Sequence, residues 1–524
     1  MQTTYDKLPY IGRAYGQTHP QHLYTIAKLF QFPAIDFTNS RILDLGCGDG
    51  SNLINIAYQL PSSICLGIDA SSVQIKKGKE MCTFAGINNC RLEHVDILEF
   101  EPPHEFDYII CHGVYSWVPP NIQRRILQIC TEFLSPNGIA YISYNTFPGW
   151  HQFHIYREMM KYHASKMTSL QDKIEQSKAI IQFAAEHVLR PNDSYGKFIR
   201  DHSDFISNLS DEYLFHEYLE DYNEALYFHQ FIDRIRASKL QYLGDSFFHS
   251  MLPPNIPQLT QSILDNISHS LYDLEQYMDF LKSRLFRSSL IVKETHNIQR
   301  EIHPSTFRDF YFQHNHKIID DEDTASIHSN GNHTDETIGA QEITEHIISI
   351  LKDTSPYMQS FDDIMSTLVK TESTDISNEQ EDDILQALQD LFLQDKIGIH
   401  SFKAPFTTKI SQKPMATPLA RFQLKHQSII SSQLQIMVTV ESEWIRDLII
   451  QLDGTKSIAE IADYLLEKDS FDLFEEEADF DFEIQEEQEN IDKEAELQLK
   501  KREFLLSRLQ QILQTIASQG LILS

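Results

Sequence analysis

The 524-residue sequence contains no run of about 18 consecutive apolar residues, which is the length of helix that crosses a lipid bilayer. Its opening, MQTTYDKLPYIGRAYG, lacks the basic segment followed by an apolar stretch that secretory signals share. We therefore expect a cytoplasmic protein with no membrane span and no membrane partner.

Sequence signatures of metal binding are also missing. All six cysteines lie between Cys47 and Cys130, and none forms a CxxC pair or a Cys/His spacing typical of a zinc site. The 23 histidines are scattered and include no HExxH motif. We therefore predict no metal centre, and we interpret the cysteines as reduced, buried thiols in a reducing compartment.

Positive charge is scarce, with 44 Lys and Arg against 76 Asp and Glu and a net charge of −32. Such a chain is poorly suited to gripping nucleic-acid phosphates, so we expect no nucleic-acid partner. Residues 1–150 contribute only −3 of this charge, whereas residues 467–496 alone contribute −13. An acidic surface suits a basic partner such as a lysine-rich protein segment, although it also serves solubility alone.

Glycine is rare outside the first 150 residues, which hold eleven of the 18 in the chain. Glycine permits tight turns and close approach of a ligand to the backbone. We therefore expect the first 150 residues to bind a ligand and the remainder to be mainly helical.

Short apolar runs that end at turn residues predict five strands, at 41–45, 64–68, 91–95, 106–111 and 138–144. Helical patterns at about 50–59, 71–85 and 121–134 separate them, and another precedes them at 20–31. Strands that alternate with helices predict a Rossmann-like, doubly wound α/β fold with a parallel sheet. Ligands of such folds bind at the carboxyl ends of the strands.

A glycine loop follows the first of these strands directly, in the sequence LDLGCGDGSN at 43–52. The next strand ends at Asp69, some twenty residues beyond the first glycine. A carboxylate there can accept hydrogen bonds from both ribose hydroxyls of a nucleoside. The third strand ends at Asp96 and Ile97, where Asp96 can accept from an adenine amino group and Ile97 can pack against the ring.

Two nucleoside cofactors compete for this site. NAD would place its pyrophosphate at the helix N-terminus, where Asp49 would repel it. S-adenosylmethionine (SAM) has no phosphate, and its positive charge suits Asp44, so SAM is favoured over NAD or a degenerate site. The predicted cofactor residues are Asp44, Gly46, Cys47, Gly48, Gly50, Asn52, Asp69, Ala70, Asp96, Ile97, His112 and Gly113.

The glycine loop resembles motif I of the class I SAM-dependent methyltransferases. Further segments are similar to one subfamily, at Tyr5-Asp6, Pro9-Tyr10, 17–20 (QTHP), 112–119 (HGVYSWVP) and 144–151 (YNTFPGWH). That subfamily carries a methyltransferase regulatory domain and includes the rickettsial protein-lysine methyltransferases. The resemblance covers about residues 1–310, is loose beyond 340, and implies a bacterial protein.

The helical and polar patterns, together with this resemblance, predict a division of the chain. Residues 1–160 would form the SAM-binding core and 161–284 a helical regulatory cap. Class I sheets end in an antiparallel hairpin, which we predict at 285–314 from the runs 286–292 and 306–313. A linker at 315–340 and a mainly helical, winged-helix-like C-terminal region at 341–524, with its acidic stretch at 467–496, would follow.

Aromatic residues gather after the fourth and fifth strands, where a methyl acceptor must arrive. The predicted substrate residues are Tyr115, Trp117, Asn145, Phe147 and Trp150. Aromatic faces attract cations, and the alternative is ordinary packing against the sheet edge. We expect Trp150 to be exposed, because it follows a strand end and a Pro-Gly turn.

No general base stands out. Tyr10, His112 and Asn145 are the candidate catalytic residues, with His151 as a further candidate base. The polar N-terminal segment that holds Tyr10 and His19 is expected to cover SAM as a lid, although His19 would equally suit the start of a helix. The pair His216-Glu217 is expected on a helix surface, with substrate binding as the alternative.

These observations favour a SAM-dependent methyltransferase acting on accessible lysines of a protein substrate. A small-molecule methyltransferase and a non-catalytic protein with a vestigial SAM site remain alternatives. The oligomeric state stays open, and the glutamate-rich block also resembles signals of some secreted bacterial effectors.

Overall fold

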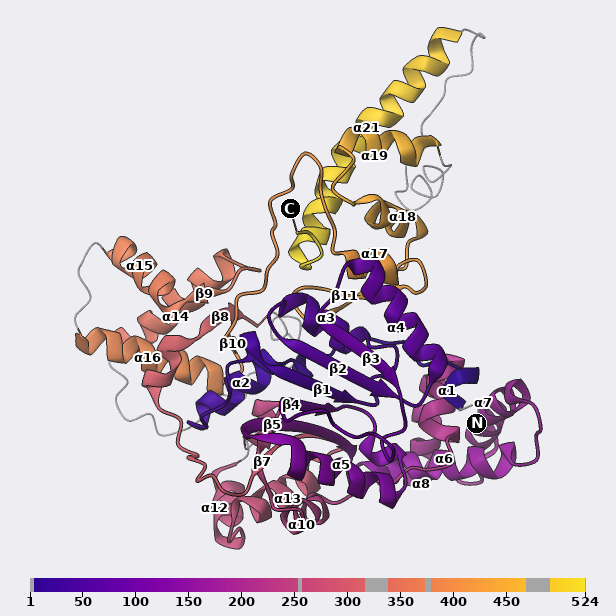
Figure 1. The fold of residues 1–524 in the computed structure, drawn as a ribbon, viewed down its shortest axis with the longest axis vertical. Helices are drawn as coiled ribbons and strands as arrows, with labels where there is room; N and C mark the ends of the chain where they lie inside the picture. The colour runs from indigo at the N-terminus through magenta and orange to yellow at the C-terminus, as the bar shows by residue number, and fades with distance from the viewer. Residues whose placement is uncertain (1–3, 253–256, 316–337, 373–377, 468–490, 524) are drawn as a thin grey trace.

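A computed structural model describes residues 4–252, 257–315, 338–372, 378–467 and 491–523 (Figure 1). Its centre is a seven-stranded sheet in the order β3-β2-β1-β4-β5-β7-β6. The strands are β1 (Arg41–Leu45), β2 (Ile64–Asp69), β3 (Cys90–His94), β4 (Phe106–Cys111), β5 (Leu134–Asn145), β6 (Leu240–Asp245) and β7 (Phe286–Lys293). The first five are parallel, and β7 runs antiparallel to both β5 and β6. The predicted Rossmann-like, doubly wound fold is confirmed.

Helices cover both faces of this sheet, which explains why its central strands are apolar runs without alternation. Ile42 and Tyr108 belong to the core on one face, whereas Leu43 and Ile109 belong to the core on the other. The covering helices include α2 (Pro20–Leu29), α3 (Ser51–Gln59), α4 (Ser72–Ala85) and α5 (Pro120–Phe133). Each begins within a residue of its predicted start.

The predicted terminal hairpin was wrong in its second strand. The run 286–292 forms β7, but the run 306–313 forms a 3-10 helix (Pro304–Asp309) and β8 (Tyr311–His314), and β8 joins a separate sheet in the order β10-β8-β9. The partner of β7 is β6, which lies inside the stretch predicted to be a helical cap. Its pairing with β7 shifts register between Tyr242 and Gly244, so β6 carries a short and interrupted apolar pattern.

Two groups of helices flank this hairpin. The insertion between β5 and β6 contains α6 (Trp150–Ala164), α7 (Leu170–His187), α8 (Ser194–Ser207), α9 (Asp211–Leu214), a π-helical turn (Phe215–Leu219) and α10 (Phe228–Ala237). We call residues 150–220 of it the cap; its helices have a core of their own. Between β6 and β7 lie α11 (Phe248–Met251), α12 (Gln258–Ile267) and α13 (Leu271–Lys282).

Buried charges join β7 to α13. Arg287 of β7 is fully buried, and its guanidinium lies 2.7 Å from Glu275 and 2.8 Å from Asp279. Its Cζ also lies 3.9 Å from the centroid of the Phe228 ring. A buried charge is stable only when it is paired and hydrogen-bonded, so this network fixes α13 on the sheet.

The C-terminal part forms two further groups of elements (Figure 1). The first has α14 (Ile338–Asp353), β9 (Gln359–Ser360), α15 (Phe361–Glu372), α16 (Asn378–Leu393) and β10 (Ile397–His400), which is the predicted order of three helices and a strand. The second has a separate apolar core and contains α17 (Pro418–Gln423), β11 (Ile429–Ser431), β12 (Met437–Thr439), α18 (Glu443–Gln451), α19 (Ile458–Glu467) and α21 (Ile491–Ser518).

The predicted linker and the predicted acidic stretch lie mostly outside the described residues. The parts that are not described are 316–337 of the linker and 468–490 of the acidic stretch. Across the described ranges, no helix combines the length and the apolar character that a membrane span requires. Those ranges also contain no group of three or more His, Cys, Asp or Glu side chains that could hold a metal ion.

Candidate functional site

The glycine loop turns sharply at the end of β1. Gly46, Gly48 and Gly50 all have positive φ, at 74°, 58° and 74°. A Cβ at Gly46 would lie 2.5 Å from Val114 Cγ2, so this position requires glycine. A Cβ at Gly48 would meet no atom within 4 Å. The surface of the loop at Gly48 is therefore open to a ligand.

Asp69 connects this loop to α4. One carboxylate oxygen accepts the Gly48 N–H at 2.9 Å, and the other accepts the Ser71 N–H at 2.7 Å. Burial raises the pKa of Asp69, against the effect of these two N–H groups. Each oxygen keeps a lone pair for a second donor, as two ribose hydroxyls would require. Ala70 follows and is exposed.

Asp44 lies inside β1 with a side chain that is almost fully buried. Burial and then the nearby Asp69 carboxylate raise the pKa of Asp44 to about 7, whereas a hydrogen bond from Asn52 lowers it. A cationic ligand would stabilise the ionised form of this carboxyl group. The site therefore fits the positive charge of SAM.

The end of β3 lies beside the end of β2, because the Val95 N–H donates to the Asp69 carbonyl at 3.0 Å. Asp96 is exposed, and one of its carboxylate oxygens accepts the Leu98 N–H at 2.8 Å. Ile97 is buried. No residue in the described ranges donates to the second oxygen of Asp96, which is therefore available to the predicted adenine amino group.

His112 and Gly113 follow β4. The Tyr141 hydroxyl donates to Ser288 Oγ at 2.9 Å and lies 2.9 Å from His112 Nδ1. Nδ1 therefore carries a proton, and Nε2 is left as an acceptor. Burial lowers the pKa of His112 to about 4, so the ring is neutral. A Cβ at Gly113 would meet no atom within 4 Å, so this strand end is also open.

The N-terminal segment, residues 4–18, lies across these strand ends. The Tyr15 N–H donates to Asn52 Oδ1 at 2.9 Å, and Gln74 Nε2 donates to the Tyr10 carbonyl at 3.0 Å. A Cβ at Gly12 would lie 1.8 Å from Asp49 Oδ1, so the segment touches the glycine loop directly. These contacts lay the segment against the glycine loop and α4, which is the position that the predicted lid requires, and we call residues 4–18 the lid.

The lid is also held from the C-terminal part of the chain. Gln427 Nε2 donates to the Gly12 carbonyl at 3.3 Å. A Cβ at Gly16 would lie 3.0 Å from the Gln435 carbonyl oxygen. His19 stands at the start of a helix, which was the alternative to a place in the lid. Its side chain caps α2 and accepts the Gln21 N–H at 3.1 Å.

The predicted substrate residues divide into two kinds. Tyr115, Asn145 and Trp150 are each at most 5% exposed. Trp150 Nε1 donates to Asn223 Oδ1 at 2.9 Å, and its ring stacks on Phe153 at 4.9 Å. The exposure expected for Trp150 was wrong, because Phe153 and Asn223 help to cover it.

Trp117 and Phe147 are half-buried and keep part of their faces free. The Trp117 ring lies 6.3 Å from that of Trp150 and 5.8 Å from Arg157 Cζ. Phe147 stacks on His151 at 4.0 Å. Asn145 Nδ2 is buried and has no hydrogen-bond partner among the described residues, so it suits a polar ligand.

Tyr15, which we did not single out in the sequence, brings two candidate catalytic residues together. Its hydroxyl is hydrogen-bonded to that of Tyr10, and its ring lies 4.0 Å from that of His112. Burial raises the pKa of Tyr10. The sequence signal was only its place within the segment that resembles the family.

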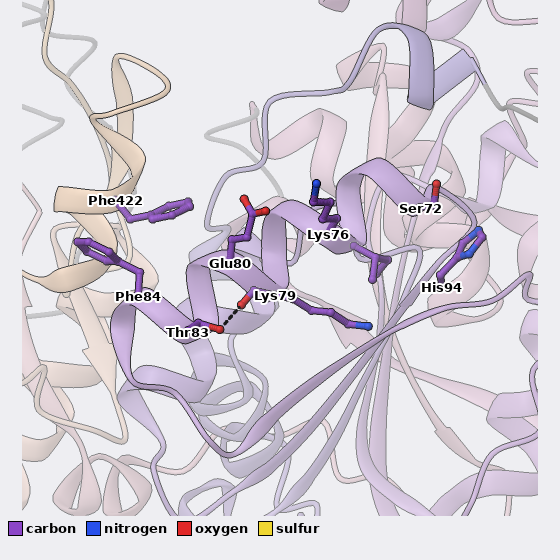
Figure 2. Close-up of a pocket in the computed structure, with 9 residues that line it drawn as sticks. Ser72, Lys76, Lys79, Glu80, Thr83, Phe84, His94 and Phe422 are labelled. Atoms are coloured by element: carbon purple, nitrogen blue, oxygen red, sulfur yellow. Dashed lines mark hydrogen bonds between the residues drawn. The ribbon is translucent and has the colours of Figure 1, made fainter.

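A groove of ≈ 690 Å³ lies elsewhere, on the outer face of α4. Figure 2 shows Phe84 of α4 and Phe422 of α17 at one end of it and Ser72 and His94 at the other. None of its nine lining residues is a predicted cofactor or substrate residue. The groove is therefore separate from the candidate site.

Comparison with known protein families gives two matches. Residues 36–195 match a methyltransferase domain, and residues 210–293 match a predicted methyltransferase regulatory domain. The first covers β1 to β5 with the glycine loop and Asp69. The second begins just before the π-helical turn and ends at β7.

Individual relatives match over greater lengths. Uncharacterized protein RP789 of Rickettsia prowazekii is 33% identical over 80% of this chain and 78% of its own length. RP028 of the same organism is 41% identical over 46% of this chain and 96% of its own. The structure of PKMT2 from Rickettsia typhi is also similar, with 30% sequence identity and a TM-score of 0.80. The match covers 98% of this chain and 100% of the PKMT2 chain. PKMT2 has also been solved in complex with AdoHcy.

Proposed function

This chain belongs to the class I SAM-dependent methyltransferases that carry a methyltransferase regulatory domain, and from that premise we propose that it methylates lysine side chains of a protein substrate. SAM is its cofactor, and it supplies an electrophilic methyl group on a sulfonium. Asp69 would hold the ribose, Asp44 the positively charged end and Asp96 with Ile97 the adenine.

The full-length similarity to PKMT2, a protein-lysine methyltransferase, carries the proposal. It spans the cap and the C-terminal elements as well as the sheet. A small acceptor would not need such additional surfaces, whereas a protein substrate can be selected by them. The half-buried Trp117 and Phe147 support the same acceptor, because aromatic faces attract ammonium groups by roughly 0.5–2 kcal/mol.

The residues of the chain have two tasks in this reaction. They align the acceptor with the methyl group and exclude water, as the lid and cap would do over the strand ends. They must also bring a neutral amine to the site, because a lysine of ordinary pKa pays about 4.6 kcal/mol to lose its proton at pH 7.

The test uses methyl-labelled SAM, the purified chain and a bacterial lysate. The precipitated protein is hydrolysed and the label is located by amino-acid analysis. We expect label in methyllysine. Label in another amino acid, or in the small-molecule fraction alone, would contradict the proposal, while label nowhere despite calorimetric SAM binding would favour the non-catalytic alternative.

A further inference from the structure

The groove on the outer face of α4 continues along the edge of the central sheet. A second hollow, of ≈ 620 Å³, is lined by Lys79 and by β3 (Cys90–His94). Because Lys79 and His94 line both hollows, the two form one groove, which we call the α4–β3 groove. No step of the proposed methyl transfer uses this groove, so it is available for another function.

One wall of the α4–β3 groove is an edge strand, because the central sheet pairs β3 with β2 alone. The Cys65 N–H donates to the Asn89 carbonyl at 2.8 Å, and the Val95 N–H donates to the Asp69 carbonyl at 3.0 Å. In a parallel ladder, the direction of the backbone groups alternates from residue to residue. The odd-numbered residues along β3 therefore direct their N–H and C=O groups toward β2.

The even-numbered residues Cys90, Leu92 and His94 direct the same groups away from β2. No strand in the described ranges pairs with this side of β3. The unpaired side of an edge strand is a template for an extended peptide, which gains affinity from main-chain hydrogen bonds. A peptide can therefore lie in the α4–β3 groove as an additional strand beside β3.

The side chains of the groove are mainly positive, although the whole chain has a net charge of −32. Lys76 and Lys79 are exposed on α4 and lie between the two ends of the groove (Figure 2). Lys425 adds a third ammonium at one end, where its Nζ lies 4.5 Å from the centroid of the Phe84 ring. None of these three ammonium groups lies within 4.0 Å of a carboxylate from the part of the chain that the structure describes.

Two carboxylates also line the groove. Glu93 forms an ion pair with Arg91 at 2.6 Å, so these two charges offset each other. Glu80 remains on α4 against the three lysines. The surplus of positive charge attracts an acidic partner and repels a basic one. It also opposes pairing with a second copy through β3, because that arrangement would bring two positive grooves together.

One end of the groove borders the cofactor half of the site. His94 Nε2 lies 3.0 Å from the carbonyl of Ala70, which follows the predicted ribose residue Asp69. The sheet order places the end of β4 three strands from β3, which corresponds to about 14 Å. An extended chain covers this distance in about five residues.

We propose that the α4–β3 groove binds an acidic, extended segment of the protein substrate as a strand added to β3, an inference that rests on the function proposed above. Main-chain hydrogen bonds to Cys90, Leu92 and His94 would hold the segment, and its carboxylates would face Lys76 and Lys79. The groove thereby selects proteins in which the acceptor lysine lies at least about five residues from such a segment.

The test uses the full-length chain and a fluorescein-labelled peptide, EVEVTVEV, which is acidic and favours an extended strand. One control peptide has N-methylated amides at alternate residues and is made in both registers, so that each form blocks one side of the added strand. A second control has lysine in place of each glutamate. Fluorescence anisotropy measures binding to the unmodified chain, to Lys79→Glu, and to Lys197→Glu, an exposed control on α8.

We expect Lys197→Glu to bind EVEVTVEV as tightly as the unmodified chain does and Lys79→Glu to bind it at least tenfold more weakly. The N-methylated register whose methyl groups face β3 should bind at least tenfold more weakly, whereas the other register should bind normally. The lysine peptide should not bind. SAM affinity, measured by calorimetry, should stay within twofold in both variants.

Methyl transfer tests the role of the groove in substrate selection. The peptide is extended at each end by a six-residue glycine-serine spacer and a lysine, so that either strand direction presents an acceptor. With labelled SAM, its KM should be at least tenfold lower than that of the same peptide with the blocked register, at a kcat within twofold. Lys79→Glu should remove this difference and leave transfer to the blocked peptide unchanged.

Equal binding of EVEVTVEV by Lys79→Glu, or normal binding of both N-methylated registers, would overturn the inference while leaving lysine methylation intact. Binding that requires removal of residues 468–490 would assign the groove to this chain's own acidic stretch, and a dimer in sedimentation that Lys79→Glu disrupts would assign it to a second copy. Either result would overturn the inference. Peptide binding without transfer to either lysine, together with no methyllysine from lysate, would instead remove the proposed function and the substrate role, although the groove would still bind the peptide.

Discussion

The two halves of the sheet's carboxyl edge are assembled over very different chain lengths. At the ends of β1 and β2, the hydrogen bond from Gly48 to Asp69 spans 21 residues. On the acceptor side, the contact between Leu8 and His216 spans 208. Local motifs thus encode the cofactor half, whereas the acceptor half depends on contacts that only the complete fold creates.

The halves also differ in what holds them together. Glycine turns and backbone hydrogen bonds shape the cofactor half. Buried charges and covered aromatic rings support the acceptor half, through Arg287 on β7 and Trp150 on α6. Substitutions should therefore affect ligand affinity in the first half and folding stability in the second.

The largest effect is expected for Arg287→Met. It leaves Glu275 and Asp279 buried without their main partner, so the free energy of unfolding should fall by about 3–5 kcal/mol. Urea denaturation measures this change. The control is Arg91→Met, because Arg91 is 79% exposed and its pair with Glu93 should contribute no more than about 1 kcal/mol. Equal losses in the two variants would contradict the role given to the buried network.

Trp150→Ala should come next, with a loss of about 3 kcal/mol, since it removes a buried ring from the junction of sheet and cap. SAM affinity, measured on the folded fraction by calorimetry, should stay within a few-fold. A variant of unchanged stability that has lost only methyl transfer would return Trp150 to the substrate residues.

Asp69→Ala tests the cofactor half, where a substitution should lower ligand affinity and leave folding stability nearly unchanged. It removes the acceptor for the ribose and for the Gly48 N–H, so SAM affinity should fall about 100-fold, as expected for two charge-assisted hydrogen bonds. Thermal unfolding of the ligand-free chain should change little. Glu132→Ala on the exposed face of α5 is the matched control, and unchanged SAM affinity in Asp69→Ala would refute the ribose assignment.

A smaller effect concerns pH. Asp44 has a pKa of about 7 without a ligand, so it binds a proton below that pH and must release it when a cation binds. SAM affinity should therefore fall as pH decreases from 7.5 to 6, by roughly tenfold per pH unit at most. Calorimetry of Asp44→Asn should show weaker binding with no such dependence. A dependence that survives this substitution would point to another group.

The sequence was sufficient for the cofactor half because its signals are local. The residues of β1 and β4 were predicted to the residue, and the glycine loop and Asp69 come together as expected. The position of β6 was missed because its apolar pattern is interrupted at the register shift near Gly244. The burial of Trp150 was missed because part of its cover comes from Asn223, 73 residues further along the chain, and Tyr15 has no neighbour in sequence that marks its role.

The hydrogen bond between Gln427 and Gly12 has a consequence for biosynthesis. Its two ends are 415 residues apart. At about 5–20 residues per second, a ribosome needs roughly 20–80 seconds to pass from one to the other. The glycine loop and α4 emerge early and can pack together within that time. During that time the lid of the nascent chain is held by nearer contacts such as those to Asn52 and Gln74, and an early-bound cofactor would meet a lid without its C-terminal anchor.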